Sequence, residues 1–216
     1  MRRAGDWWLP GADAYFAPFL EAADGFQLDH LEAALAHCRS WRCAIDGGAH
    51  VGTWTVAMAM RFAHVYAFEP AADTFSCLTR NVSERGLTNV IAMNVALGAE
   101  SGVCVVTDDV TRVGNTGARY LKALNGAGGS RVSVLALDEM GLTTVDFVKL
   151  DLEGYEHFAL RGAEQTIRQC RPVVVVEEKN FGGRYGQAAG AASALLRDWG
   201  AREVARAGKD VIFIFD

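Results

Sequence analysis

The segment DGGAHVG, residues 46–52, constrains the fold of this chain more than any other feature of its sequence. It follows a short apolar run at residues 43–45, which is typical of a strand buried on both faces. Residues 53–61 after it have the length and composition of a helix. Glycines between a strand and a helix let the backbone turn sharply and approach a ligand closely. The order of strand, glycine-rich turn and helix therefore predicts an α/β fold with a nucleotide-type binding loop.

A carboxylate after the next strand pattern supports that prediction. Glu69 follows the apolar run 64–68 and lies about 20 residues after the first glycine of the loop, where dinucleotide sites place the acid that accepts ribose hydroxyls. Asn94 ends a third strand pattern, residues 89–94, and its amide can either pair with an adenine edge or form a turn. The candidate cofactor-binding residues are Asp46, Gly47, Gly48, Ala49, His50, Gly52, Glu69 and Asn94.

The charge of the loop distinguishes two classes of cofactor. Ala49 stands where dinucleotide sites have the middle glycine that makes room for a pyrophosphate. Asp46 would repel a pyrophosphate, whereas its charge suits the ammonium or sulfonium of S-adenosylmethionine. The N-terminus of the following helix would favour the methionine carboxylate of that cofactor. The loop therefore favours S-adenosylmethionine over NAD, and a tight turn without a ligand is the remaining alternative.

Strand and helix patterns alternate along most of the chain. The predicted strands are residues 43–45, 64–68, 89–94, 103–106, 131–137, 145–150, 172–176, 201–205 and 211–215, and the predicted helices are residues 28–38, 53–61, 75–82, 155–166 and 188–199. Such alternation predicts a doubly wound, mostly parallel sheet. The last two strand patterns are separated by a short turn-like segment at residues 208–210, which predicts a C-terminal antiparallel hairpin.

Acidic side chains follow several of these strands. Asp151 and Glu153 come after the strand at residues 145–150, and Glu177 comes after the strand at residues 172–176. Because ligands bind at the carboxyl ends of the strands in such a sheet, we expect these acids to share one rim with Glu69. The alternative for Glu153 is that it complements the charge at the start of the next helix.

Taken together and in order, the motifs resemble those of the FkbM family of S-adenosylmethionine-dependent methyltransferases. The matching segments are DGGAHVG at 46–52, FEP at 68–70, NVALG at 94–98, VDFVKLDLEGYE at 145–156, LRGA at 160–163 and PVVVVE at 172–177. The resemblance implies a Rossmann-like class I methyltransferase fold with seven strands, the last of them antiparallel, and usually methyl transfer to a hydroxyl oxygen. Gly47 departs from the family, which often has a bulkier residue there, and we expect it to slacken the loop slightly.

Methyl transfer to a hydroxyl requires positioning and a group that takes the hydroxyl proton. We expect Asp151 to be that catalytic base, or to orient the acceptor hydroxyl, and Glu153 and Glu177 to bind the substrate. His50 and His157 are weaker candidates for the base. Asp151 and Glu177 are also hard oxygen ligands, but the sequence shows no dedicated metal cage and we expect no metal.

Two segments fall outside the family motifs. We expect one domain over 1–216, with 1–40 forming a cover segment and a helix and 41–216 forming the Rossmann-like core. The aromatic-rich start of the chain is either a cover packed on the core or a substrate wall. The pattern of residues 107–130 predicts a glycine-rich loop, which is either a substrate lid or a surface insertion. We expect substrate choice to depend on these two segments.

The net charge of -5 gives the chain no general attraction to nucleic acid or to an anionic membrane. We therefore expect a small-molecule or sugar acceptor that is methylated on a hydroxyl, and no nucleic-acid partner. One alternative is a nucleic-acid methyltransferase acting on RNA ribose or cap, which rests on the basic residues Arg112, Arg119, Lys122 and Arg131. Another is a module that binds S-adenosylmethionine without catalysis.

The five cysteines are scattered and form no C-x-x-C motif, so the reducing cytoplasm is the expected compartment. Residues 1–10 contain charged, aromatic and proline residues in place of the apolar region of a signal peptide. No apolar run approaches the ~20 residues that a membrane span needs.

Overall fold

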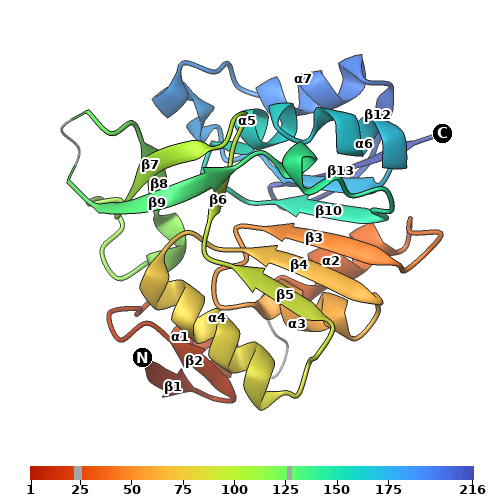
Figure 1. The fold of residues 1–216 in the computed structure, drawn as a ribbon. Coiled ribbons are helices and arrows are strands. Elements are labelled where there is room, and N and C mark those ends of the chain that lie inside the picture. The colour runs from red at the N-terminus through yellow and green to blue at the C-terminus, as the bar shows by residue number, and fades with distance from the viewer. Residues whose placement is uncertain (22–25, 126–127) are drawn as a thin grey trace.

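A seven-stranded sheet forms the centre of the computed structural model, which describes residues 1–21, 26–125 and 128–216 (Figure 1). In spatial order its strands are β12 (Ala201–Ala207), β13 (Asp210–Phe215), β11 (Val173–Glu177), β10 (Phe147–Leu150), β3 (Cys43–Gly47), β4 (His64–Phe68) and β5 (Val90–Met93). The strands from β11 to β5 are parallel, and β13 is antiparallel to both of its neighbours. The predicted mostly parallel, doubly wound sheet and its C-terminal antiparallel hairpin are confirmed.

The central strands are apolar because both of their faces are covered. Every residue of β3, β10 and β11 is buried. Helices α2 (Leu28–Leu35), α3 (Thr53–Ala59) and α4 (Ala72–Glu84) cover one face, and α5 (Glu156–Arg161), α6 (Glu164–Cys170) and α7 (Ala191–Asp198) cover the other (Figure 1). The prediction of a single helix over 155–166 is wrong, because two helices, α5 and α6, form there. The Asp138 carboxylate accepts hydrogen bonds from the backbone N–H groups of Gln165 and Thr166, which caps a separate start for α6.

The chain reverses its direction of winding between β3 and β10. From β3 it proceeds outward through β4 and β5, and it then returns to the other side of β3 to form β10 and β11. Adjacent parallel strands whose connections leave in opposite directions open a crevice at their carboxyl ends. Lys149 pairs in register with Asp46 across this junction, and Leu150 pairs with Gly47. The fold therefore positions a ligand site at the end of the glycine-rich segment.

A second, four-stranded sheet stands beside the main one. Its strands are β6 (Ala96–Leu97), β9 (Ser130–Leu135), β7 (Gly102–Thr107) and β8 (Tyr120–Lys122). The sequence predicted strands at residues 103–106 and 131–137 but gave no sign that they leave the main sheet. The predicted loop over residues 107–130 contains β8 and a 3-10 turn at Thr116–Ala118, and its residues 126–127 lie outside the described residues. This segment, called the arm below, therefore contains regular structure and is not a single loop.

The start of the chain forms a hairpin, β1 (Arg2–Ala4) and β2 (Trp7–Leu9), followed by α1 (Ala17–Glu21). The side-chain amide of Asn81 on α4 accepts a hydrogen bond from Trp8 N (2.8 Å) and donates one to Trp8 O (3.0 Å). Apolar residues of the hairpin pack against Val51 of the glycine-rich loop. This contact supports the interpretation of the start of the chain as a cover packed on the core.

Within the described ranges, no helix combines the length and the apolar character needed to cross a bilayer.

Candidate active site

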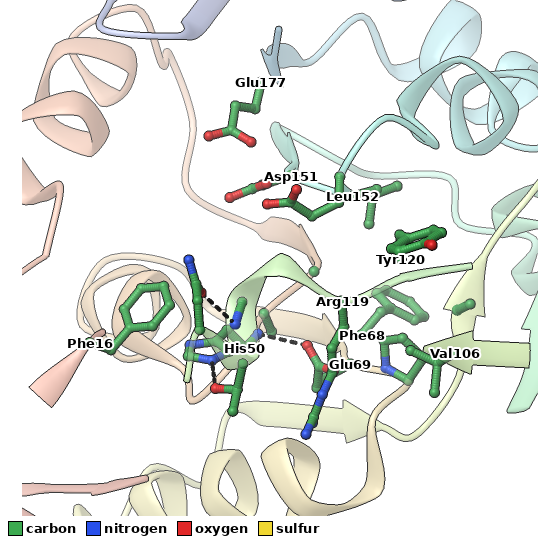
Figure 2. A pocket seen from close by; sticks show the side chains of 18 of the residues that line it. Phe16, His50, Phe68, Glu69, Val106, Arg119, Tyr120, Asp151, Leu152 and Glu177 are labelled. Atoms are coloured by element: carbon green, nitrogen blue, oxygen red, sulfur yellow. Dashed lines mark hydrogen bonds between the residues drawn. The ribbon is translucent and has the colours of Figure 1, made fainter. Parts of the chain in front are cut away.

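A cavity of about 420 Å³ opens at the carboxyl ends of β3, β4, β10 and β11 (Figure 2). Such a volume is in the range of small-molecule sites. Figure 2 shows His50 and Glu69 on one side of the cavity and Asp151 and Glu177 on the other. The cavity lies at the reversal of winding between β3 and β10, where the sheet topology predicts a ligand.

Two glycines fix the shape of the loop below this cavity. Gly48 has a φ of +73°, and a Cβ placed on it would lie 1.9 Å from the carbonyl oxygen of Asp151. Gly52 has a φ of +96°, and a Cβ there would lie 2.6 Å from Leu78 of α4. Gly47 needs no left-handed backbone, but its Cβ would lie 2.8 Å from Leu150. Gly47 therefore permits close packing within the sheet.

Asp46 is buried beneath the loop and faces a lysine. Its carboxylate accepts a hydrogen bond from Thr55 Oγ1 (2.6 Å) and forms an ion pair with Lys149 Nζ (3.1 Å). Among the described residues that line the cavity, Lys149 is present and Asp46 is not. The prediction that Asp46 contacts the cofactor therefore has no support in this geometry, because Lys149 already balances its charge.

Sequence reasoning missed Lys149, although a lysine inside an otherwise apolar strand pattern is a signal for a functional or paired charge. Its ammonium donates a hydrogen bond to Gly48 O (2.7 Å). Burial lowers the pKa of Lys149, but the carboxylates of Asp46 and Asp151 outweigh that effect and raise it overall. Lys149 is thus a charged link between the loop and the end of β10.

Of the other predicted cofactor residues, Gly48, Ala49, His50 and Glu69 line the cavity. Gly47, Gly52 and Asn94 are missing from the described lining residues. The side-chain amide of Asn94 donates to the carbonyl oxygens of Glu69 (2.8 Å) and Pro70 (2.9 Å). Asn94 therefore holds the turn after β4, which is the alternative role that its sequence position allowed.

Glu69 presents a buried carboxylate to the cavity. Its Oε2 accepts a hydrogen bond from His50 N (3.0 Å), and its Oε1 accepts one from Ala71 N (2.9 Å). Burial raises the pKa of Glu69 to about 7, against the opposing effect of these hydrogen bonds. A carboxylate has about four lone-pair positions, so about two remain for hydroxyl groups of a ligand. That capacity fits a ribose diol.

His50 is held by residues from the two segments outside the family motifs. Its Nε2 lies 2.8 Å from Thr116 Oγ1, and the Thr116 hydroxyl bonds to Oδ2 of Asp13. Because the hydroxyl donates its single hydrogen to the carboxylate, His50 Nε2 must donate to the hydroxyl oxygen. Burial lowers the pKa of His50 to about 4, so the ring is neutral and Nδ1 carries no proton. The ring of Phe16 packs over the imidazole at 4.3 Å between centroids.

The two outlying segments therefore reach the cavity. Tyr15 and Phe16 from the start of the chain line it, as do Thr116 and Tyr120 from the arm. No sequence pattern pointed to Asp13 or Thr116, because their contacts join parts of the chain that are far apart in sequence.

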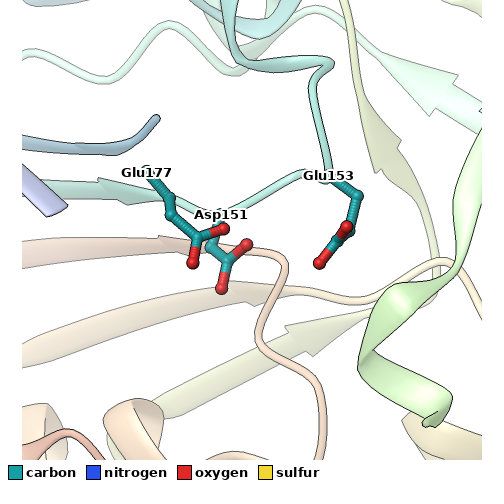
Figure 3. A group of neighbouring side chains, drawn as sticks. All are labelled: Asp151, Glu153 and Glu177. Carbon is teal, nitrogen blue, oxygen red and sulfur yellow. The ribbon is translucent and has the colours of Figure 1, made fainter. Parts of the chain in front are cut away.

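The structure brings Asp151, Glu153 and Glu177 together at the opposite side of the cavity (Figure 3). One carboxylate oxygen from each lies within 4.8 Å of the others. Burial opposes ionisation of Asp151, but the Lys179 ammonium and a hydrogen bond from Glu177 outweigh it and lower the pKa of Asp151. Burial and the charge of Asp151 raise the pKa of Glu177. The two pKa values are thus shifted in opposite directions, which favours the ionised form of Asp151 and the neutral form of Glu177.

Glu156 and the candidate base His157 lie away from the described lining of the cavity. Glu156 Oε1 accepts hydrogen bonds from Leu152 N (2.8 Å) and Gly154 N (3.1 Å), so it fixes the turn before α5. His157 Nδ1 lies 3.4 Å from the carbonyl oxygen of Ala191, which joins α5 to the start of α7. This placement gives no support to His157 as a base.

Known proteins show similar sequences and folds. The model of the Methyltransferase FkbM domain matches residues 46–203. Hexuronic acid methyltransferase AglP of Haloferax volcanii is 29% identical over 137 residues, which cover 60% of this chain and 53% of that protein. This chain thus spans about half the length of that relative.

Solved structures share the fold. A methyltransferase FkbM from Methylobacillus flagellatus superposes with a TM-score of 0.54 at 16% identity, over 82% of this chain and 44% of that one. A SAM-dependent methyltransferase from Aquifex aeolicus gives a TM-score of 0.52 at 14% identity, over 95% of each chain. The family match covers most of the chain and includes the glycine-rich loop, Glu69 and the acidic cluster. The chain belongs to the FkbM methyltransferase family.

Proposed function

We propose that this chain transfers the methyl group of S-adenosylmethionine to a hydroxyl oxygen of a sugar or another small molecule. The single observation that carries the proposal is that Glu69 and Asp151 line one cavity directly above the Gly48 turn. The Glu69 carboxylate can bind a ribose, and the Asp151 carboxylate can bind a hydroxyl group, in the same cavity. The family match supports the reaction class.

Different residues of the site serve the two ligands, which are the cofactor and the acceptor. When bound, S-adenosylmethionine supplies an electrophilic methyl group on a sulfonium. Glu69 would accept hydrogen bonds from the ribose hydroxyls of the cofactor, and the backbone of Gly48 and Ala49, together with His50, would line its site. Glu153 and Glu177 line the same side of the cavity as Asp151 and form the wall of the acceptor site.

Asp151 orients the acceptor hydroxyl and receives its proton. The pKa of Asp151 is lowered, because the Lys179 ammonium and Glu177 outweigh burial, so the side chain is ionised but weakly basic. A weak base suffices if the proton leaves late, since the oxygen becomes strongly acidic as its bond to the methyl group forms. Holding the hydroxyl in line with the methyl group supplies much of the rate.

A sugar acceptor is supported by the relative named as a hexuronic acid methyltransferase. The cavity offers carboxylates and hydroxyl groups that can bind sugar hydroxyls, beside the aromatic rings of Phe16 and Tyr120. Nucleic acid is not the expected partner, because Arg112 is paired with Glu153 and Arg119 is paired with Asp73 and Asp108. Two of the basic residues that would bind phosphates are thus already neutralised.

The proposal extends to the whole of 1–216 acting as one methyltransferase domain, with 1–40 as the cover segment and 41–216 as the core. It also places the protein in the reducing cytoplasm. The free cysteines support that compartment, because thiols persist where the environment is reducing.

The test is transfer of a labelled methyl group from S-adenosylmethionine to a panel of hexuronic acids, neutral glycosides and short RNAs. The expected result is labelling of a sugar that Asp151→Asn reduces at unchanged cofactor affinity. Labelling of RNA alone would establish the nucleic-acid alternative. Cofactor binding without labelling of any acceptor would favour the non-catalytic module.

A further inference from the structure

The ammonium of Lys179 lies among the three carboxylates of the acidic cluster. Its Nζ is 2.6 Å from Glu177, 2.8 Å from Glu153 and 3.5 Å from Asp151. Lys179 comes two residues after the end of β11 and lines the same cavity as the three acids. Lys179 stands outside the family motifs, so no sequence pattern points to it.

This arrangement has the geometry of a small cation site. A lysine ammonium carries three N–H donors and no acceptor, so it can direct one donor toward each of the three carboxylates. Three carboxylate oxygens within 4.8 Å of one another are also the hard ligands that Mg²⁺ and Ca²⁺ prefer. The three acids are neighbours in Figure 3. The ammonium of Lys179 contacts all of them.

Two cations face the three acids of the cluster. Lys179 contacts all three acids, and Glu153 also receives Nη1 of Arg112 at 3.3 Å. Glu153 and Glu177 are almost fully buried, with exposed side-chain fractions of 5% and 3%. A buried charge that loses its partner is strongly disfavoured, so the cluster requires a cation.

Asp151 has the longest of the three contacts and the most exposed carboxylate, at 27%. It is therefore the acid with room to face an acceptor, while the other two hold the ammonium in place. We propose that Lys179 is a positioning residue that takes the place of a divalent cation in this site and holds the Asp151 side chain toward the acceptor hydroxyl. The role toward the acceptor rests on the proposed function, whereas the exchange of ammonium for metal does not.

The first experiment measures metal binding without any methyl transfer. Wild-type protein, Lys179→Met and Lys179→Arg are titrated with CaCl₂ and MnCl₂ by calorimetry, and their melting temperatures are recorded with and without the metal. Lys179→Met should gain one site, with a Kd of about 10⁻⁴–10⁻³ M for Ca²⁺, and its melting temperature should rise with metal. Wild type and Lys179→Arg should show neither effect.

Two controls assign any new site to the cluster. Lys179→Met combined with Glu153→Gln should lose the gained metal site. Lys122→Met, which removes an exposed lysine from β8, should bind no metal. A wild-type protein that binds one divalent ion in this cluster would overturn the proposal, and so would a folded Lys179→Met protein that gains none.

The second experiment measures methyl transfer. Wild-type activity should be unchanged by EDTA, Lys179→Met should lose at least about tenfold in kcat, and Mn²⁺ should restore part of the loss in that variant alone. Wild-type activity abolished by EDTA and restored by metal would contradict the proposal. If no acceptor is found, the metal titrations still decide the role of Lys179, and titration with S-adenosylmethionine separately decides the proposed function.

Discussion

Gly48 and Asp151 meet so closely that a Cβ on Gly48 would lie 1.9 Å from the Asp151 carbonyl oxygen. This contact joins the turn after β3 to the end of β10 and sets the distance between the cofactor loop and the candidate base. The two halves of the site are therefore in direct contact, and a side chain at Gly48 must separate them.

Gly48→Ala should weaken S-adenosylmethionine binding and destabilise the fold. The left-handed backbone costs a non-glycine residue about 1–2 kcal/mol, and overpacking against Asp151 adds about 1–3 kcal/mol. Gly86→Ala is the matched control, because Gly86 has a φ of +63° and no atom of the described chain lies within 4 Å of its added Cβ. Urea unfolding and calorimetry should show the backbone cost in both variants and lost cofactor binding only in Gly48→Ala. Equal cofactor binding by both would contradict the prediction.

The affinity for S-adenosylmethionine should increase as pH rises from about 6 to about 8. Burial raises the pKa of Glu69 to about 7, and the ionised form is the better acceptor for two hydroxyl groups. Binding should therefore release a proton from Glu69 near neutral pH. Calorimetry in buffers of different ionisation enthalpy measures that proton. Glu69→Gln should bind more weakly and independently of pH over this range, and the same pH dependence in both proteins would exclude Glu69 as its source.

The unliganded protein should respond to pH in the opposite direction. Because folding raises the pKa of Glu69 from its ordinary 4.5 to about 7, the neutral form stabilises the fold below pH 4.5. This contribution is lost as pH rises toward about 7, where the buried carboxyl ionises. The Glu69→Gln protein, whose side chain stays neutral, should lack that loss. Urea unfolding of both proteins at pH 5 and pH 8, without cofactor, measures the difference.

Thr116→Val should destabilise the protein and disturb His50. The valine has nearly the shape of threonine but leaves His50 Nε2 without its hydroxyl partner, at a cost of about 1–3 kcal/mol. Thr116→Ser keeps the hydroxyl and is the control. Nitrogen-15 NMR of the His50 ring should show Nε2 protonated in wild type and in Thr116→Ser. A wild-type ring protonated at Nδ1 would show that the Asp13–Thr116–His50 chain runs differently.

Asp146 should contribute stability that disappears in acid. Burial opposes its ionisation, but hydrogen bonds from Arg42 and Ser40 outweigh this and lower the pKa of Asp146 to about 2. A depressed carboxyl pKa contributes stability that is present above about pH 4 and lost as pH falls toward 2. The contribution is about 2 kcal/mol. Asp146→Asn should lower the free energy of unfolding at pH 7 by this order, and the two proteins should converge near pH 2. A constant difference down to pH 2 would contradict the linkage.

The sequence predicted those site residues that come directly after a strand. Glu69, Asp151, Glu153 and Glu177 each follow a strongly apolar run, and parallel strands bring their carboxyl ends to one rim. The sheet and its hairpin follow from the same pattern, and the match to residues 46–203 confirms the family.

Contacts between strands that are distant in sequence could not be predicted from such local patterns. The charge of Asp46 predicted a contact with the cofactor. In the structure, β10 brings Lys149 beside Asp46 in register, and its ammonium pairs with that charge. The pairing of β7, β8 and β9 into a second sheet likewise depends on tertiary contacts. The hydrogen bond between His50 and Thr116 spans 66 positions of the chain, and no local pattern encodes it.

The most direct test of the account is parallel calorimetric titration of the protein with S-adenosylmethionine, its demethylated product and NAD, using Glu69→Ala as the control. The account predicts micromolar binding of the first two ligands, weakened in Glu69→Ala by about 1.5–3 kcal/mol for the lost bonds to a charged group. Binding of NAD alone would contradict it and would make the glycine-rich loop a dinucleotide site.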